Sequence, residues 1–132
     1  MTDNIARKVL VLGGSRGIGA SIVRRFAGAG DNVAFTYAGS ADAASALADE
    51  TGAQAIRSDS VDRDQTIATV AAQGAIDVLV VNAGTLALGD PLTLDPDAID
   101  RMIDINVRAP YHASVEAARA MPDGGRIIVI GS

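Results

Sequence analysis

Residues 12–19 read Leu12-Gly13-Gly14-Ser15-Arg16-Gly17-Ile18-Gly19 and lie between an apolar run and a segment with helical periodicity. Glycine permits a sharp turn and a close approach of the backbone to a ligand, and the free N–H groups at a helix N-terminus attract anions. A strand, a glycine turn and a helix in direct succession are typical of a site for the pyrophosphate of a dinucleotide. The alternative is a tight strand-to-helix turn that uses glycine only for its positive φ.

The chain around this turn alternates short apolar runs with longer periodic segments, as repeated βαβ units do. Because the runs mostly lack polar alternation, we expect strands that are buried on both faces of a parallel sheet. The pattern predicts one α/β domain over residues 1–132, a Rossmann-type three-layer α/β/α fold with a parallel sheet, truncated after its fifth strand. The predicted strands are Lys8 to Leu12, Asn32 to Tyr37, Gln54 to Arg57, Ile76 to Val81 and Arg126 to Ile130.

Periodic segments between these runs predict the helices. In the first helix, Ile18, Ile22 and Phe26 recur at i, i+4 and i+8, so we expect these side chains to face the sheet. Two alanine-rich helices are predicted over residues 41–50 and 62–73.

The fourth predicted helix begins with Asp95 as its N-cap and Pro96 in its first turn, and we expect Pro110 to kink or divide it. Asn106 shares a face with apolar residues, so its amide is predicted to point towards the sheet, where it needs partners. A buried asparagine that only backbone groups satisfy is the alternative to a chemical role. The residues predicted on this face are Ile99, Met102, Ile103 and Asn106.

Composition narrows the choice of ligand and location. The 132 residues are 48% hydrophobic and only 3% aromatic, which suits one core of small aliphatic side chains. A net charge of −5 without a basic block disfavours nucleic acid and membrane surfaces as partners, and no apolar stretch could span a bilayer. No cysteine and a single histidine exclude a zinc cluster, so no metal is expected. We expect a cytoplasmic protein with a small-molecule nucleotide ligand.

The end of the second predicted strand indicates which dinucleotide. A site for NAD(H) usually places an acid there to bind the ribose 2′-hydroxyl, but residues 35–40 read FTYAGS and contain none. Arg16 in the glycine turn can reach a 2′-phosphate, and Tyr37 at the strand end is a further candidate contact. The sequence therefore favours NADP(H), with a solvated loop arginine as the alternative for Arg16.

Two segments resemble the short-chain dehydrogenase/reductase family. LGGSRGIGASIV resembles the family's TGxxxGxG cofactor turn, with Leu12 in place of the usual threonine. Residues 77–84, DVLVVNAG, resemble its D-x-L-V-N-N-A-G strand, with Val81 in place of the first asparagine. Both departures fall in neighbouring elements, so we predict that a Leu12–Val81 apolar contact replaces the family's polar bracing of the turn.

The resemblance implies further cofactor contacts. Asp59, with Ser60 beside it, matches the aspartate that contacts the adenine, although an acid there also suits a helix cap or a solvated loop. Residues 82–84 (Asn82, Ala83 and Gly84) match the strand exit that lines the cofactor ribose, and a plain glycine-assisted strand exit is the alternative. The complete set of predicted cofactor residues is Gly13, Ser15, Arg16, Gly17, Ile18, Gly19, Tyr37, Asp59, Ser60, Asn82, Ala83 and Gly84.

The resemblance also implies catalytic residues. Asn106 matches the asparagine that holds a water in the family's proton relay, and Ser132 matches the serine that hydrogen-bonds the substrate. The family's general acid/base is the tyrosine of a Tyr-x-x-x-Lys motif, which the sequence does not contain, because Tyr37 and Tyr111 are followed four residues later by Ala41 and Val115.

Two functions follow as expectations. In the first, the complete protein is an NADP(H)-dependent oxidoreductase that moves a hydride between the cofactor and a carbonyl or alcohol, while these 132 residues alone are inactive. In the second, the fold binds NADP(H) or cyclic-di-GMP without turnover, since AFTYAGS, APYHASVEAARAMP and GGRIIVIGS resemble a family member that binds this cyclic dinucleotide. We expect a homo-oligomer, and a protein of only these 132 residues is predicted to associate through its exposed last strand.

Overall fold

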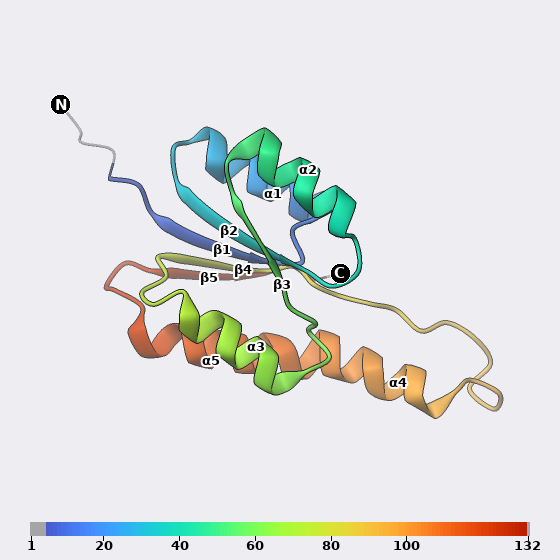
Figure 1. Ribbon diagram of the computed structural model, residues 1–132. Coiled ribbons are helices and arrows are strands. Elements are labelled where there is room, and N and C mark those ends of the chain that lie inside the picture. The colour runs from blue at the N-terminus through green and yellow to red at the C-terminus, as the bar shows by residue number, and fades with distance from the viewer. Residues whose placement is uncertain (1–4, 132) are drawn as a thin grey trace.

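The computed structural model describes residues 5–131 and shows five strands and their connecting helices (Figure 1). The strands are β1 (Lys8–Leu12), β2 (Asn32–Tyr37), β3 (Gln54–Arg57), β4 (Val78–Val81) and β5 (Arg126–Val129). The helices are α1 (Gly17–Gly28), α2 (Ala41–Thr51), α3 (Arg63–Ala72), α4 (Pro96–Ile103), the π-helix η1 (Asp104–Arg108) and α5 (Ala109–Ala120).

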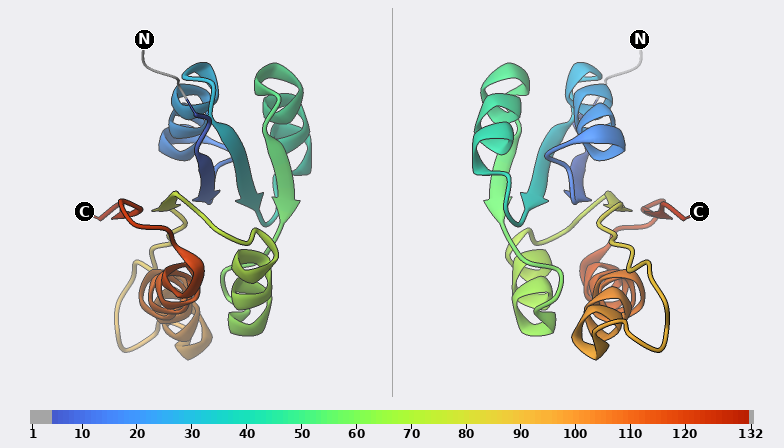
Figure 2. Two further views of the ribbon diagram at one scale, coloured as in Figure 1. Left: turned by 90° about the vertical axis from the view of Figure 1, so that its left-hand side faces the viewer. Right: turned by 90° about the vertical axis from the view of Figure 1, so that its right-hand side faces the viewer.

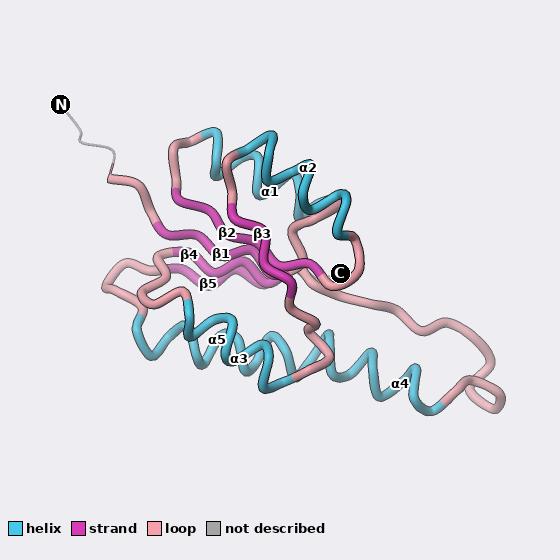
Figure 3. Tube along the Cα trace, in the orientation of Figure 1, coloured by secondary structure: helices cyan, strands magenta, loops and turns pink. Residues whose placement is uncertain are grey.

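The strands form one parallel sheet in the order β3-β2-β1-β4-β5. β1 lies in the middle, where Val9 pairs with Val33 of β2 on one side and with Val78 of β4 on the other. In Figure 3 the strands run side by side between two sets of helices. The predicted Rossmann-type α/β fold is confirmed.

Two helical layers bury the two faces of the sheet. α1 and α2 cover one face, and α3 and α5 cover the other (Figure 2). Side chains of β1 alternate between the layers, so Val9 and Val11 belong to one apolar cluster while Leu10 and Leu12 belong to the second. Burying each such side chain contributes about 1.5–3 kcal/mol, so β1 anchors both cores.

The face of α1 that meets the sheet differs from the prediction. Ala20 and Val23 are buried against the strands, whereas Ile18 is 63% exposed and Ile22 and Phe26 are only partly buried. The helix crosses close to the sheet, so small residues occupy the contact. The apolar spacing of 18, 22 and 26 therefore identified the helix and two residues that pack against the core, Ile22 and Phe26, but wrongly included Ile18.

The long helix is divided before Pro110, as predicted. Proline lacks the N–H that would donate to the carbonyl of Asn106, and the five residues preceding α5 adopt the wider π-helical turn η1. The predicted inward face is wrong for α4, because this helix has no buried residue and Ile103 is 39% exposed.

β5 forms one edge of the sheet and is exposed along its length, with Ile127, Ile128 and Val129 39–55% exposed. Within residues 5–131, no helix combines the length and apolar character needed to cross a membrane.

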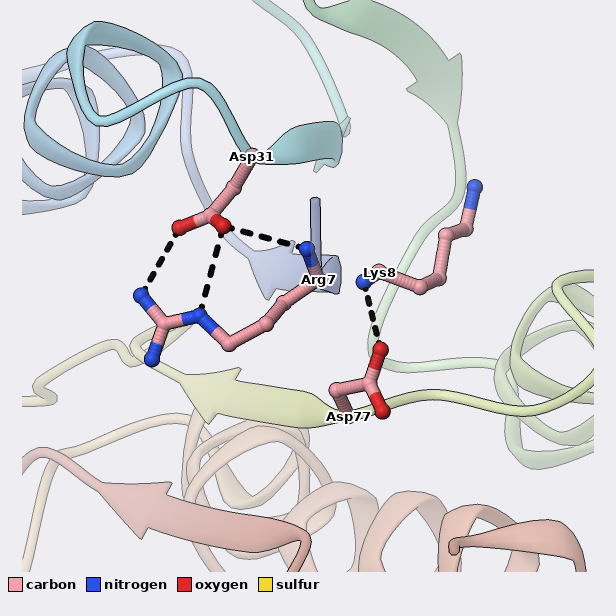
Figure 4. A network of polar contacts seen from close by, with 4 residues as sticks. All are labelled: Arg7, Lys8, Asp31 and Asp77. Carbon is pink, nitrogen blue, oxygen red and sulfur yellow. Dashed lines mark hydrogen bonds and ion pairs between the residues drawn. The ribbon is translucent and has the colours of Figure 1, made fainter. Parts of the chain in front are cut away.

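A polar network holds the amino ends of the strands together (Figure 4). The Arg7 guanidinium donates to both carboxylate oxygens of Asp31, at 2.8 and 3.3 Å, and the Arg7 backbone N–H also donates to this carboxylate. The Lys8 N–H donates to Asp77 Oδ2 at 2.7 Å. Residues immediately before β1, β2 and β4 are thereby tied to one another. The Arg7 guanidinium lowers the pKa of Asp31 below its ordinary value.

Candidate functional site

A cleft of about 350 Å³ lies at the carboxyl ends of β1, β2, β3 and β4. This is the edge of an open α/β sheet where ligands bind. Its walls come from the glycine turn, the ends of β2 and β3, the exit of β4 and one face of α4 and η1. The lining residues are Gly13, Ser15, Arg16, Thr36, Tyr37, Ala38, Gly39, Ser40, Ser58, Asp59, Ser60, Asn82, Ala83, Gly84, Thr85, Arg101 and Ile105.

The glycine turn is packed tightly against neighbouring backbone. Gly13 has φ +79°, and a Cβ there would lie 2.7 Å from Ala83 Cα. A Cβ on Gly19 would overlap the Gly13 carbonyl oxygen and would lie 2.8 Å from Asn82 Nδ2. Both positions exclude a side chain, so glycine is required here for close approach and, at Gly13, for its positive φ as well.

Polar groups of β2 and of the β4 exit support this turn. The Gly13 N–H donates to Thr36 Oγ1, and the Gly14 N–H donates to the Thr36 carbonyl, both at 3.0 Å. Asn82 Nδ2 donates to the Gly13 carbonyl at 3.0 Å. The turn is therefore held from two sides before any ligand arrives.

Leu12 and Val81, the two departures from the family pattern, lie beside each other. They are paired in the β1–β4 register and belong to the same apolar cluster. Leu12 and Val81 are therefore neighbours, as the predicted apolar contact requires. The polar groups that brace the turn are those of Thr36 and Asn82.

The start of α1 differs from the starts of α3 and α4. Asp62 caps α3 by accepting from the Gln65 N–H at 3.0 Å, and Asp95 caps α4 by accepting from the Asp97 N–H at 2.9 Å. The N-cap of α1 is Arg16, which makes no side-chain cap within the described chain, and the first turn of α1 holds no acid. The backbone N–H groups in the first turn of α1 and the positive end of its dipole are therefore available to an anion.

Two arginines give the cleft a positive charge. Over residues 5–131, neither Arg16 nor Arg101 has a carboxylate partner within ion-pair distance, whereas the ion pairs that form there use Arg7, Arg24, Arg63, Arg108 and Arg119. Asp59 is the one acid among the lining residues, and its Oδ1 accepts from the Val61 N–H at 3.1 Å. The arrangement suits a small anion with polar groups.

Most of the predicted cofactor residues come together in this cleft. Those that line it are Gly13, Ser15, Arg16, Tyr37, Asp59, Ser60, Asn82, Ala83 and Gly84. The other three do not: Gly19 is buried beneath the turn, and Gly17 and Ile18 lie on the outer surface of α1. Gly17 and Ile18 belong to the first turn of α1, so their backbone N–H groups, rather than the exposed Ile18 side chain, stay the predicted contacts.

Asn106 lies elsewhere than predicted. Its side chain accepts from the Thr85 N–H at 3.0 Å and donates to the Thr85 carbonyl at 2.6 Å, and the residue is exposed rather than buried against the sheet. Backbone groups of Thr85 satisfy the amide, which fastens η1 to the segment after β4, and the role of Asn106 in holding a water stays a prediction. The predicted substrate contact Ser132 lies outside the described residues.

Sequence reasoning missed several lining residues. Thr36 carried a usable signal, because a hydroxyl in the middle of a buried strand needs a partner, and this side chain is only 2% exposed. Ser40 and Ser58 follow predicted strands and could also have been placed at this edge. Arg101 and Ile105 carried no such signal, because their place depends on where α4 lies.

Comparison with known proteins identifies the relatives of this chain. The family model of the short-chain dehydrogenases matches residues 7–132. The cyclic-di-GMP-binding biofilm dispersal mediator protein of Escherichia coli is 64% identical over 126 residues, which are 96% of this chain and 53% of that protein. Elsinochrome reductase 1 of Elsinoe fawcettii is 37% identical over 99% of this chain and 53% of its own length.

Solved structures agree with this relationship. The crystal structure of BdcA in complex with NADPH is 63% identical, superposes with a TM-score of 0.94, and is matched over 96% of this chain and 52% of that one. A short-chain dehydrogenase from Burkholderia cenocepacia in complex with NADP is 42% identical, with a TM-score of 0.88 over 96% of this chain and 55% of that one. The chain thus spans about half the length of the relatives it matches, and it belongs to the short-chain dehydrogenase family.

Proposed function

We propose that the cleft binds NADP(H), with the pyrophosphate at the start of α1 and the adenosine half between the ends of β2 and β3. The observation that carries this proposal is the uncapped N-terminus of α1 beside an unpaired Arg16, within a glycine turn that admits no side chain at Gly13 or Gly19. The residues fit the cofactor, because the lining supplies two cations and one acid whose carboxylate already accepts a backbone hydrogen bond.

The 2′-phosphate is assigned to Arg16 and Ser40. Both line the cleft, and Ser40, the N-cap of α2, makes no side-chain cap within the described chain. The residues between Tyr37 and Ser40 carry no acid that would repel a phosphate. A guanidinium and a hydroxyl are strong donors to phosphate oxygens. NADP and NADPH in the structures of relatives support the same choice.

We further propose that this chain supplies the cofactor-binding part of an oxidoreductase that acts on a carbonyl or alcohol. The bound nicotinamide would supply or accept the hydride. Asn106 acts as a positioning residue, because it holds the Thr85 backbone at the floor of the cleft. The 132 residues contain no Tyr-x-x-x-Lys motif.

Calorimetric titration with NADPH and with NADH tests the proposal. We expect NADPH to bind at least about tenfold more tightly, because a charge-assisted contact to the 2′-phosphate contributes a difference of this size. Equal affinity for the two cofactors would overturn the assignment of the 2′-phosphate, and the absence of binding would overturn the proposed function.

A second candidate function is the binding of cyclic-di-GMP. It is favoured by the 64% identity to the Escherichia coli protein whose name records this ligand. Competition decides between the two: if cyclic-di-GMP occupies the same cleft, it should displace NADPH completely and with a single affinity. Failure to displace NADPH at saturating concentration would exclude a shared site.

Self-association is proposed as well. In residues 5–131 no strand pairs with the outer edge of β5, and its apolar side chains are 39–55% exposed, which suits a strand contact with a second copy. Sedimentation velocity should show a dimer or larger species. The substitution Ile128→Lys should shift it to the monomer, and a monomeric unsubstituted chain would contradict this proposal.

A further inference from the structure

Arg101 reaches the cleft from the wall opposite the glycine turn. α1 lies on one side of the sheet and α4 on the other (Figure 1), yet Arg16 at the start of α1 and Arg101 of α4 line the same cleft. A ligand that fills the cleft therefore lies between two guanidinium groups supplied by different layers of the fold.

In the part of the chain that the structure describes, the Arg101 side chain forms no ion pair with the acids near it in the sequence. Asp97 is four residues before it and Asp104 three residues after it, and both spacings allow an ion pair on a helix. Within residues 5–131 Arg101 pairs with neither, while Asp104 pairs with Arg108. Helix-surface electrostatics thus does not account for the direction of the Arg101 side chain.

Burial does not account for the position of α4 either. The helix has no buried residue, and its continuation is fastened by the hydrogen bonds of Asn106 to Thr85. Arg101 and Ile105, which lie one helical turn apart, are the residues that this wall contributes to the cleft. This wall therefore contributes the Arg101 guanidinium and the buried Ile105 side chain to the cleft.

The chemistry of this wall suits a flat base better than a phosphate. Four acids flank Arg101 in the sequence, and although Asp104 is paired with Arg108, their negative charge disfavours a second phosphate on this side. A guanidinium is planar, weakly hydrated and stacks on aromatic rings, and Ile105 adds an apolar surface. The four acids are Asp95, Asp97, Asp100 and Asp104.

We propose that Arg101 stacks on the purine base of the bound nucleotide, whose phosphates are held by the glycine turn and Arg16 on the other wall. The purine is the adenine of NADP(H) or the guanine of cyclic-di-GMP. This inference rests on the proposed nucleotide-binding function and adds a specificity-determining residue to it.

The test measures the affinities of four variants for NADPH, for 2′,5′-ADP, which keeps the purine and both phosphates on its ribose but lacks nicotinamide, and for cyclic-di-GMP. Arg101→Ala should weaken NADPH and 2′,5′-ADP equally, by about tenfold, as the loss of one stacking contact predicts. Arg101→Phe, which keeps a flat surface, should retain more affinity than Arg101→Lys, which keeps only the charge. Arg25→Ala is the matched control, because Arg25 is exposed and lies outside the cleft.

Each remaining outcome has a defined meaning. A loss with cyclic-di-GMP but not with NADPH identifies guanine as the stacked base. Unchanged affinities in Arg101→Ala overturn the stacking proposal and leave the proposed function standing. Rescue by lysine but not by phenylalanine also overturns it, because Arg101 would then act as a charge. An unsubstituted chain that binds none of the three ligands overturns the proposed function together with this inference.

Discussion

The two ends of the sheet differ in whether their charged side chains have partners within the protein. At the amino ends, the Asp31 and Asp77 carboxylates accept hydrogen bonds from Arg7 and Lys8, and the Asp31 side chain is only 6% exposed (Figure 4). At the carboxyl ends, Arg16 and Arg101 line a cleft and pair with no acid of the described chain.

We infer that the charged residues at the amino ends stabilise the fold, whereas those at the carboxyl ends bind a ligand. Buried polar groups are normally satisfied within the protein, as they are at the amino ends. Arg16 has no ion-pair partner in residues 5–131 and lies at the uncapped N-terminus of α1, so it is suited to an anionic ligand. Changes at one end should therefore alter stability, while changes at the other should alter affinity.

The largest expected effect is at the glycine turn. Gly19→Val should abolish detectable NADPH binding and destabilise the chain by about 1–3 kcal/mol, because its side chain overlaps the Gly13 carbonyl. Gly28→Ala in the same helix is the control: a Cβ there meets nothing within 4 Å, so stability and affinity should be retained. Titration calorimetry and thermal unfolding measure both quantities, and tight NADPH binding by Gly19→Val would contradict the assignment of the turn.

A smaller effect on NADPH affinity is expected when Arg16, at the carboxyl ends of the strands, is replaced. Arg16→Ala should lower the affinity for NADPH by about 10- to 100-fold and leave the affinity for NADH nearly unchanged, because only NADPH carries the 2′-phosphate. The melting temperature should not change, since Arg16 is exposed and has no ion-pair partner in residues 5–131. Equal losses for both cofactors would place Arg16 at the pyrophosphate instead.

At the amino ends the effect should be on stability alone. Asp31→Asn removes the carboxylate that Arg7 contacts, and we expect the melting temperature to fall by a few degrees at neutral pH with unchanged NADPH affinity. The Arg7 guanidinium lowers the pKa of Asp31 below 3.8 in the folded chain. The stabilisation is therefore present above that value and is lost as the pH falls through the lowered pKa.

Acid unfolding measures this contribution. Unfolding curves recorded from pH 7 to pH 2 should converge for the unsubstituted chain and Asp31→Asn at the acid end. A constant difference across the whole range would show that ionisation of Asp31 does not contribute to stability.

The smallest effect is expected for an ion pair away from both ends. Glu50 and Arg24 pair at 2.7 Å, but both side chains are about half exposed. Arg24 also lowers the pKa of Glu50, yet solvent screening leaves such pairs with little net stabilisation. Glu50→Gln should unfold at nearly the same temperature as the unsubstituted chain, and a fall as large as that of Asp31→Asn would remove the contrast between the buried Asp31 carboxylate and the exposed Glu50 carboxylate.

Local patterns in the sequence were sufficient for the strands and for most of the cleft. β1, β2 and β3 have the predicted bounds, whereas β4 begins at Val78 and β5 ends at Val129, each inside its predicted range. The residues after each strand gather at one edge because parallel strands share a direction. The glycine turn and Asn82 could be placed for this reason.

Features that depend on tertiary placement were not predictable. The spacing of Ile18 is that of an inner helix face, but Ile18 is exposed and the buried apolar side chains of α1 are those of Ala20 and Val23. Asn106 was predicted to face the sheet, yet the π-turn before Pro110 directs its amide to Thr85. Arg101 entered the cleft only once the position of α4 was known.

Changes in the backbone amide chemical shifts on addition of NADPH distinguish the two ends of the sheet most directly. In the ¹⁵N-labelled chain, saturating NADPH should move the amide resonances of residues 13–19, 37–40, 58–60 and 82–85, at the carboxyl ends. The amides of Arg7, Asp31 and Asp77 should stay in place. Shifts centred on the amino ends, or no shifts at all, would contradict the account.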